Sequence, residues 1–424
     1  MSNPNLNQIA DHLFRHSSGK MVSVLTKIFG TENLETAEDV VQQTFIDAIR
    51  VWKIKGIPDN PNAWLFRVAK NKAIDIIRRN KHSVQYDFSN DERMLLLSEY
   101  TMATTMNQFW NEELIKDDLL RMMFACCHPD ISEENQMTLI LKTLCGFSTS
   151  EIAKAFLTTD DTISKRLYRT KEFFREHRVK LIIPSVDELK KRVEGVLHSI
   201  YLLFNEGYNS TNAEDVIRED LIDEAMMLCR LLTENKHTQM PETFALMALM
   251  CFHSSRTRGR IGEQGEIILL PNQDRSRWDK RLMEEGNSYL NKAAFGTTVS
   301  SFHLEAAIAY EHCIAKSFDE TNWEKILQLY EWLCIISPSP VSELNKVVAV
   351  LQVKGPAEAM KALHSISGKK RLESYYLYHS LLGEIHLRMK LTAEASCHFK
   401  KAISLTKSEA EKKVLRDKLA ISVN

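Results

Sequence analysis

The sequence predicts an all-α protein. Apolar residues recur at helical spacing along most of the 424 residues, and strand-like alternation of apolar and polar residues is almost absent. Helix-breaking residues are also few, with 14 glycines and 10 prolines. The chain is too long for one ordinary domain, so we expect about two to four of them.

The composition indicates a cytoplasmic protein. The formal net charge is −1, so the whole chain is not a general nucleic-acid binder, and any attraction to DNA has to come from local charge asymmetry. No apolar run approaches the roughly 18 residues that cross a bilayer, and the first residues lack a secretory signal. The eight cysteines have no disulfide-framework spacing, which fits a reducing compartment.

Changes in these patterns divide the chain into four expected parts. They are a helical bundle at residues 1–82, an acidic linker at 83–118, a helix-turn-helix module at 119–182 and a helical array at 183–424. The linker combines an excess of acidic residues with Ser, Asn and Thr. Pro184 marks the break before the array.

Within the first part, residues 37–48 have the pattern of an amphipathic helix. Val40 and Ile46 are among its apolar positions. Taken alone, the opposite polar face is explained by contact with water. The polar residues on that face are Asp39, Gln42 and Gln43.

A second helix is predicted to begin at Pro61, because proline is tolerated at the first helical position and Asn60 can cap it. Its basic side chains are opposed only by Asp75 and alternate with aromatic residues. This mixture suits single-stranded DNA, whose bases stack on rings while cations neutralise the backbone. Taken singly, Trp64 and Phe66 are better explained as core residues. The candidate DNA-binding residues here are Asn62, Trp64, Arg67, Lys70, Asn71 and Arg78.

The third part has the pattern of a helix-turn-helix. Gly146 can end a first helix, and Ser148 with Glu151 forms a capping box for the next. A polar turn and a basic helix follow, which is the geometry that places a recognition helix in the major groove. A solvated helix in an ordinary bundle is the alternative. The candidate DNA-binding residues are Thr162, Ser164, Lys165, Arg166, Tyr168, Arg169 and Lys171.

The cluster Cys126-Cys127-His128 is the one group that suggests a metal site, and it has no second ligand pair at a usual zinc spacing. We expect instead a buried helix end closed by Pro129. No phosphate-binding loop, nucleophile–base pair or carboxylate pair stands out. The sequence therefore predicts no catalytic residue, no metal and no cofactor, and we expect that the protein is not an enzyme.

The fourth part is predicted to be a series of helices, at residues 186–204, 213–233, 241–254 and 278–295 and then in shorter segments. Late in the chain the spacing is similar to that of a tetratricopeptide repeat, whose helix pairs must stack to bury their apolar faces. A generic helical bundle is the alternative. The residues at the repeat positions are Leu382, Gly383, His386, Ala395, Phe399 and Ala402.

Three arginines in the array, Arg256, Arg258 and Arg260, form a basic stretch. We expect a solvated loop there, with an anion-binding site as the less favoured interpretation.

Two parts of the chain resemble RNA polymerase sigma factors. The stretch E-I-A-K-A-F at 151–156, followed by T-I-S-K-R-L-Y-R at 162–169, is similar to sigma domain four, which reads the upstream promoter element. Leu157 departs from the glycine common in such turns. The helix at 37–48 and the motif N-P-x-A-W-L-x-R-x-A-x-N at 60–71 resemble sigma domain two.

The remaining resemblance concerns the subgroup. Sigma domains one and three have no counterpart, as in the extracytoplasmic-function group. The stretches L-L-F-N-E-G-Y at 202–208 and N-Q-D-R-S-R-W-D at 272–279 resemble those of a subgroup with a fused tetratricopeptide-like tail.

This resemblance implies that Asp39, Gln42 and Gln43 contact core RNA polymerase and that both DNA-binding parts engage promoter DNA. It also implies that the helix beginning at Pro61 holds the non-template strand. A protein or peptide partner of the tail, and action of the tail on the sigma parts in cis, are further expectations. The alternative is a helix-turn-helix regulator on a helical scaffold that is not a sigma subunit, although such a regulator has no need of residues 37–79.

Overall fold

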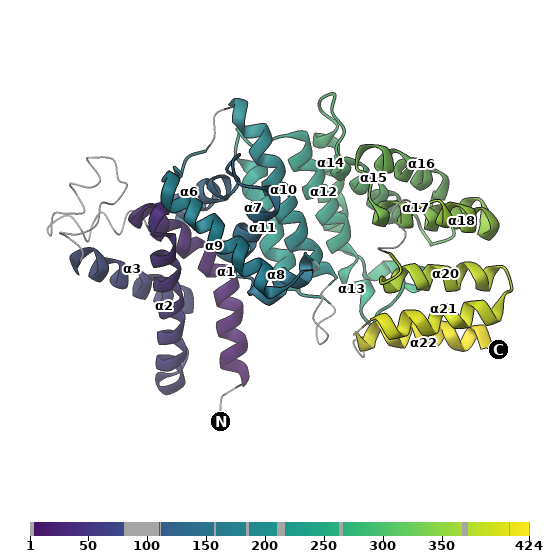
Figure 1. The fold of residues 1–424 in the computed structure, drawn as a ribbon, viewed down its shortest axis with the longest axis horizontal. Helices are drawn as coiled ribbons and strands as arrows, with labels where there is room; N and C mark the ends of the chain where they lie inside the picture. The colour runs from purple at the N-terminus through teal and green to yellow at the C-terminus, as the bar shows by residue number, and fades with distance from the viewer. Residues whose placement is uncertain are drawn as a thin grey trace. The chain divides into compact units, whose positions relative to one another are not determined.

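The computed structural model describes residues 4–79, 110, 112–156, 158–183, 186–209, 217–262, 266–366, 372–406 and 408–423. Across these residues the protein is almost entirely helical (Figure 1), which confirms the predicted all-α class. Their one β feature is an isolated bridge between Ile261 and Ile267. In the same described ranges, no helix combines the length and the apolar composition needed to cross a membrane.

The chain forms two compact units. The first contains Met1–Glu206 and Asp220–Thr238, and the second contains Gly207–Glu219 and Gln239–Asn424. Both predicted DNA-binding parts and the start of the predicted array therefore share one unit. Most of the expected linker lies outside the described residues, as do Leu157 and Pro184. The division of the chain into four parts by function stays a prediction.

The first unit opens with a bundle of α1 (Pro4–Phe29), the 3-10 helix η1 (Thr31–Asn33), α2 (Leu34–Lys55) and α3 (Pro61–Arg79). Gly30 and Gly56 end α1 and α2 with φ of 88° and 81°, a backbone region that favours glycine. The predicted cap of α3 is present, because Ala63 N donates a hydrogen bond to Asn60 Oδ1 at 2.9 Å.

The helix-turn-helix region contains α6 (Glu112–Cys126), α7 (Glu133–Thr143), α8 (Thr149–Ala155) and α9 (Asp160–His177). The predicted capping box is formed: Ser148 N donates to Glu151 Oε2 at 2.8 Å, and Glu151 N donates to Ser148 Oγ at 3.2 Å. Helix α9 packs on α7 and α8 through Ile163, Leu167 and Phe174, which are buried. The structure thus forms the two predicted helices of the helix-turn-helix.

Helix α1 packs against α2, α3, α6 and α7. Its closest approach is at Gly19, where an added Cβ atom would lie 2.0 Å from the carbonyl oxygen of Leu144. That oxygen belongs to the backbone at the end of α7, so it has little freedom to move. Helices α10 (Val186–Tyr208) and α11 (Glu219–Glu234) supply the rest of the unit.

The second unit is a series of helices in which neighbours along the chain pack on one another from α14 to α22, as in repeat proteins. Between α20 and α21, an added Cβ at Gly383 would lie 2.6 Å from Phe399 Cε1, so only glycine admits the ring. The helices are α12 (Pro241–Ser255), α13 (Thr257–Arg260), α14 (Lys280–Ala293), α15 (Ser301–Ile314), α16 (Trp323–Ile336), α17 (Pro340–Val353), α18 (Gly355–His364), α20 (Tyr376–Arg388), α21 (Thr392–Leu405) and α22 (Glu409–Val423), with the 3-10 helices η2 (Leu270–Asn272) and η3 (Arg275–Arg277).

We expect Gly19→Ala to destabilise the first unit, although alanine favours helix. The methyl group would meet the Leu144 carbonyl, and such overpacking costs about 1–3 kcal/mol. Thermal unfolding followed by circular dichroism checks this, with Lys20→Ala on the same helix as the control. A melting temperature of the Gly19→Ala protein equal to that of the Lys20→Ala protein would contradict the close contact.

Candidate functional site

The three residues predicted to contact a polymerase share one face of α2. Asp39, Gln42 and Gln43 are exposed, and all three line a groove of about 570 Å³ between α2 and α3. The other lining residues from α2 are Thr36, Val40 and Ile46, and those from α3 are Lys72, Asp75, Ile76 and Arg79. The structure therefore brings the predicted contact residues together on one accessible surface.

An ion pair joins the two walls of this groove. Lys72 Nζ on α3 lies 2.7 Å from Asp47 Oδ2 on α2, and Gln43 Nε2 donates to Asp47 Oδ1 at 3.2 Å. The hydrogen bond from Lys72, with that from Gln43, lowers the pKa of Asp47 against a smaller opposing effect of burial. Asp47 is therefore charged near neutral pH, and it positions Gln43 at the groove.

The predicted DNA-binding residues of α3 fall into two groups. Asn62, Arg67, Asn71 and Arg78 are exposed, whereas Lys70 and Trp64 are half-buried. The Trp64 ring packs edge-on against the buried ring of Trp52, with centroids 5.4 Å apart. The exposed basic side chains are accessible to a DNA strand, and Trp64 fits the alternative interpretation as a residue packed at the edge of the core.

Helix α9 presents most of its predicted contact residues to solvent. Ser164, Lys165, Tyr168 and Arg169 are exposed, with Tyr168 at 60%. Lys165 Nζ pairs with Asp161 one turn earlier, at 2.6 Å, and both side chains are well exposed. Surface pairs of this kind contribute little stability, so DNA phosphates can replace the aspartate at small cost.

Two other predicted residues of α9 are engaged within the helix-turn-helix. Thr162 N donates to the cap Thr159 Oγ1 at 3.3 Å, which starts the helix. Arg166 Nη2 lies 2.6 Å from Glu134 Oε2 on α7, and its guanidinium lies over the Phe156 ring at 5.8 Å. Arg166 therefore also orients α9 on its neighbours.

The C-terminal half of α9 faces acidic residues of α2. Lys171 Nζ lies 2.5 Å from Glu38 Oε2, and Arg175 Nη2 lies 3.0 Å from Glu35 Oε2. The Lys171 and Glu38 side chains are 18% and 14% exposed, so water screens this pair less than the Lys165 pair. Lys171, predicted to bind DNA, is paired here with Glu38 of α2.

A contact that the sequence analysis did not predict joins α1 to α8. Arg15 Nη2 lies 2.9 Å from Glu151 Oε1, so the capping carboxylate of α8 is also an ion-pair partner. Burial alone would raise the pKa of Glu151, but hydrogen bonds from Ser148 and the Arg15 charge outweigh it and lower the pKa to about 2.

Helix α1 also contacts α11, which belongs to the predicted array. Arg15 Nε lies 3.6 Å from Asp220 Oδ2, and His16 Nδ1 lies 3.0 Å from Glu224 Oε2. No short sequence motif signals these pairs, because their partners are separated by about 200 residues. They join the start of the chain to a helix that follows the helix-turn-helix.

The cysteine cluster forms a buried helix end, as we expected. Helix α6 ends at Cys126, and the Cys126 and Cys127 side chains are 0% and 1% exposed. Burial raises the pKa of both thiols, so they stay protonated. The described residues place no group of three or more His, Cys, Asp or Glu side chains where a metal ion could bind.

The expectation of a solvated loop at the three arginines is wrong for Arg256, which is 8% exposed. Arg256 Nη2 donates to the Tyr208 hydroxyl at 3.2 Å and to His253 Nδ1 at 2.9 Å. The Arg260 guanidinium lies 3.9 Å from the centroid of the Tyr208 ring. Arg256 itself lies over the Trp278 ring, 5.9 Å from its centroid. Its burial is possible because neutral acceptors and this ring face replace water.

Arg256 contacts one residue from each of the two stretches at 202–208 and 272–279. Tyr208 comes from the first, and Trp278, which is buried, comes from the second. Arg275 lies over Trp278 at 4.5 Å, and its Nη1 donates to the carbonyl oxygens of His312 and Ala315 at 2.6 and 2.7 Å. The second stretch thus provides a hydrogen-bond donor for the carbonyl groups at the C-terminal end of α15.

Comparison with known proteins identifies two regions of the chain. Residues 13–83, which contain α2 and α3, match the model of sigma-70 region 2. The chain contains a sigma-70 region 2 domain. Residues 192–294 match a family of unknown function (DUF6596).

The chain also has a relative of similar length. It is 32% identical over 387 residues to the uncharacterised protein R00370 of Rhizobium meliloti (strain 1021), covering 91% of this chain and 90% of that protein. The two therefore belong to one family along nearly their whole lengths. No solved structure matches the chain.

Proposed function

We propose that the chain is a sigma factor of the extracytoplasmic-function group, which binds core RNA polymerase and directs promoter recognition and DNA melting. The observation that carries this proposal is the sigma-70 region 2 match, because it covers the groove formed by Asp39, Gln42 and Gln43. Helix α3, which forms one wall of that groove, also carries exposed basic residues. Such residues suit binding to the non-template DNA strand.

Helix α9 supports the second half of the proposal. Its exposed residues, Ser164, Lys165, Tyr168 and Arg169, offer donors and a ring for base edges in a major groove. The chain would contribute binding energy and register, while the polymerase performs the chemistry, so we propose that it is not itself an enzyme. Such a role places it in the cytoplasm with the polymerase.

A helix-turn-helix regulator that never joins the polymerase remains the second candidate. The packing of α9 on α7 and α8 supports DNA binding equally in both cases. The two candidates differ in the groove between α2 and α3, which only a sigma subunit needs. Transcription from a promoter upstream of the chain's own gene, reconstituted with purified core polymerase, decides between them.

We further propose that the C-terminal region is a tetratricopeptide-like array that regulates the sigma parts in cis. The buried Gly383, Ala395, Phe399 and Ala402 support the repeat assignment. The contacts of α11 with Arg15 and His16 support a direct influence on the helix-turn-helix, since Arg15 also holds Glu151. A concave array of this type accepts a peptide or protein partner.

Replacing Asp39 and Gln43 together by Arg is expected to weaken association with core polymerase roughly tenfold or more, because charge complementarity across an interface is reversed. Circular dichroism should be unchanged, since both side chains are exposed. Binding to immobilised core polymerase measures this, with Asp59→Arg, an exposed site outside the groove, as the control. Wild-type binding by the double variant would exclude this face.

Replacing Lys165 and Arg169 together by Ala is expected to weaken promoter binding while leaving polymerase binding intact. Each lost contact costs about 1–3 kcal/mol. A mobility-shift titration at fixed salt measures the effect, and Lys180→Ala, exposed beyond the end of α9, is the control. If the double variant binds the promoter as tightly as the control, α9 does not present its exposed face to DNA.

A chain that ends at Thr238 is expected to differ from the full chain in reconstituted transcription by about fivefold or more, as for a regulatory coupling. This end keeps α10 and α11, which complete the first unit, so the unit's core is retained. Circular dichroism of the shortened chain verifies its helices. Equal activity of the two chains, with and without cell extract, would contradict regulation in cis.

A further inference from the structure

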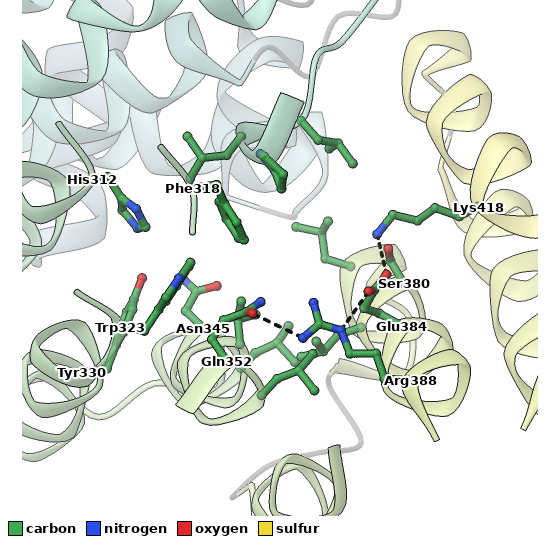
Figure 2. Close-up of a pocket in the computed structure, with 18 residues that line it drawn as sticks. His312, Phe318, Trp323, Tyr330, Asn345, Gln352, Ser380, Glu384, Arg388 and Lys418 are labelled. Atoms are coloured by element: carbon green, nitrogen blue, oxygen red, sulfur yellow. Dashed lines mark hydrogen bonds and ion pairs between the residues drawn. The ribbon is translucent and has the colours of Figure 1, made fainter. Parts of the chain in front are cut away.

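The second unit contains a cavity of about 510 Å³ that the proposed function does not use. Side chains from α15, α16, α17, α20 and α22 line it (Figure 2), together with residues 269–271. Sites for small molecules commonly have volumes of about 300–1,000 Å³, with mostly apolar walls and a few placed polar groups. This cavity has a volume in that range and mostly apolar walls. Its polar groups are gathered at one end.

One end is aromatic. The Trp323 ring packs edge-on against Phe318 and His312, with centroids 5.2 and 5.3 Å away. Leu344 and Leu351 of α17 continue this wall. Figure 2 shows Trp323, Phe318 and His312 grouped on the side away from Lys418. An aromatic or aliphatic group entering here would replace water at an apolar surface, which is favourable.

The other end is charged. Glu384 Oε1 lies 3.2 Å from Arg388 Nε, and Glu384 Oε2 lies 3.2 Å from Lys418 Nζ. Gln352 Oε1 accepts a hydrogen bond from Arg388 Nη1 at 3.2 Å. Burial opposes ionisation, but Lys418 and Arg388 outweigh it and hold the pKa of Glu384 below its ordinary value. Two cations therefore face one carboxylate, which leaves a surplus of one positive charge.

Two more positively charged side chains, Arg256 and Arg275, act on His312 at the aromatic end. Arg275 Nη1 donates a hydrogen bond to the His312 carbonyl oxygen. Burial, followed by the charges of Arg256 and Arg275, lowers the pKa of His312 to about 3, so its ring is neutral. The buried Nδ1 of His312 has no hydrogen-bond partner among the described residues. Glu384 is the one carboxylate among the residues described as lining the cavity. The surroundings consequently favour an anion over a neutral or cationic ligand.

We propose that this cavity binds a small amphipathic organic acid, whose apolar body lies against Trp323 and Phe318 and whose anionic group pairs with Arg388 and Lys418. The inference goes beyond the proposed function, since binding in the second unit does not require that the chain act as a sigma factor. The binding measurement can therefore fail while transcription succeeds, and the reverse.

The test uses the full chain and the fluorescent aromatic anion 8-anilinonaphthalene-1-sulfonate as the probe. Three competitors share one ring system and differ in the head group: 1-naphthoate, 1-naphthalenemethanol and 1-naphthylmethylamine. We expect saturable probe binding and displacement by the carboxylate at roughly tenfold lower concentration than by the alcohol, as one charge-assisted contact provides. The amine should be the weakest competitor.

Variants locate the site. Lys418→Met removes the surplus charge and is expected to weaken probe binding roughly tenfold, whereas Glu384→Gln adds to that surplus and should tighten it. Ser380→Phe should weaken binding, because Ser380 lines the cavity and the larger ring would occupy part of it. Arg416→Met is the matched control on α22, since Arg416 pairs with Glu409 and does not line the cavity.

Three results would overturn the proposal. The first is the absence of saturable binding to the wild-type chain, which needs no variant to fold. The second is equal displacement by the three naphthyl competitors, which would remove the role of charge. The third is unchanged probe binding by Ser380→Phe, at wild-type helical content by circular dichroism, which would place the probe elsewhere.

Discussion

The first unit depends on the close packing of α1. This helix touches α2, α3, α6 and α7, and at Gly19 its backbone meets the Leu144 carbonyl with no space for a side chain. Because α2 and α3 form the groove while α7 packs against α9, one helix sets the relation between both candidate surfaces. The ion pair of Arg15 with Glu151 extends the same constraint to α8.

Charge on α9 serves two different contacts. The ion pair of Lys165 with Asp161 is exposed, so water screens it. The ion pair of Lys171 with Glu38 of α2 is half-buried. If both Lys165 and Lys171 bind DNA, Lys171 has to leave the Glu38 carboxylate and pair with a phosphate instead. Helix α2 then loses its ion pair with Lys171. In that case, DNA binding by α9 would be linked to the arrangement of α2 through Lys171.

The second unit tolerates buried cations because it provides neutral partners. Arg256 has the Tyr208 hydroxyl and the His253 ring as acceptors. Burial, then the charge of Arg256, lowers the pKa of His253 well below its ordinary value, so the ring is neutral and accepts. Because these partners are neutral, they leave the positive charge of Arg256 uncompensated. An organic acid in the neighbouring cavity would be attracted by this charge.

The sequence by itself determined the local features: the helical class, the Asn60 cap, the capping box of Ser148 and Glu151, and the exposed row of Asp39, Gln42 and Gln43. These follow from spacings of a few residues, where periodicity and capping chemistry act. Only the tertiary structure decided that Arg256 is buried, that Lys171 meets Glu38, that Arg15 and His16 reach α11, and that distant helices enclose a cavity. Burial and ion pairing depend on which surfaces meet, and residues 100 or more positions apart leave no periodic trace of that in the sequence.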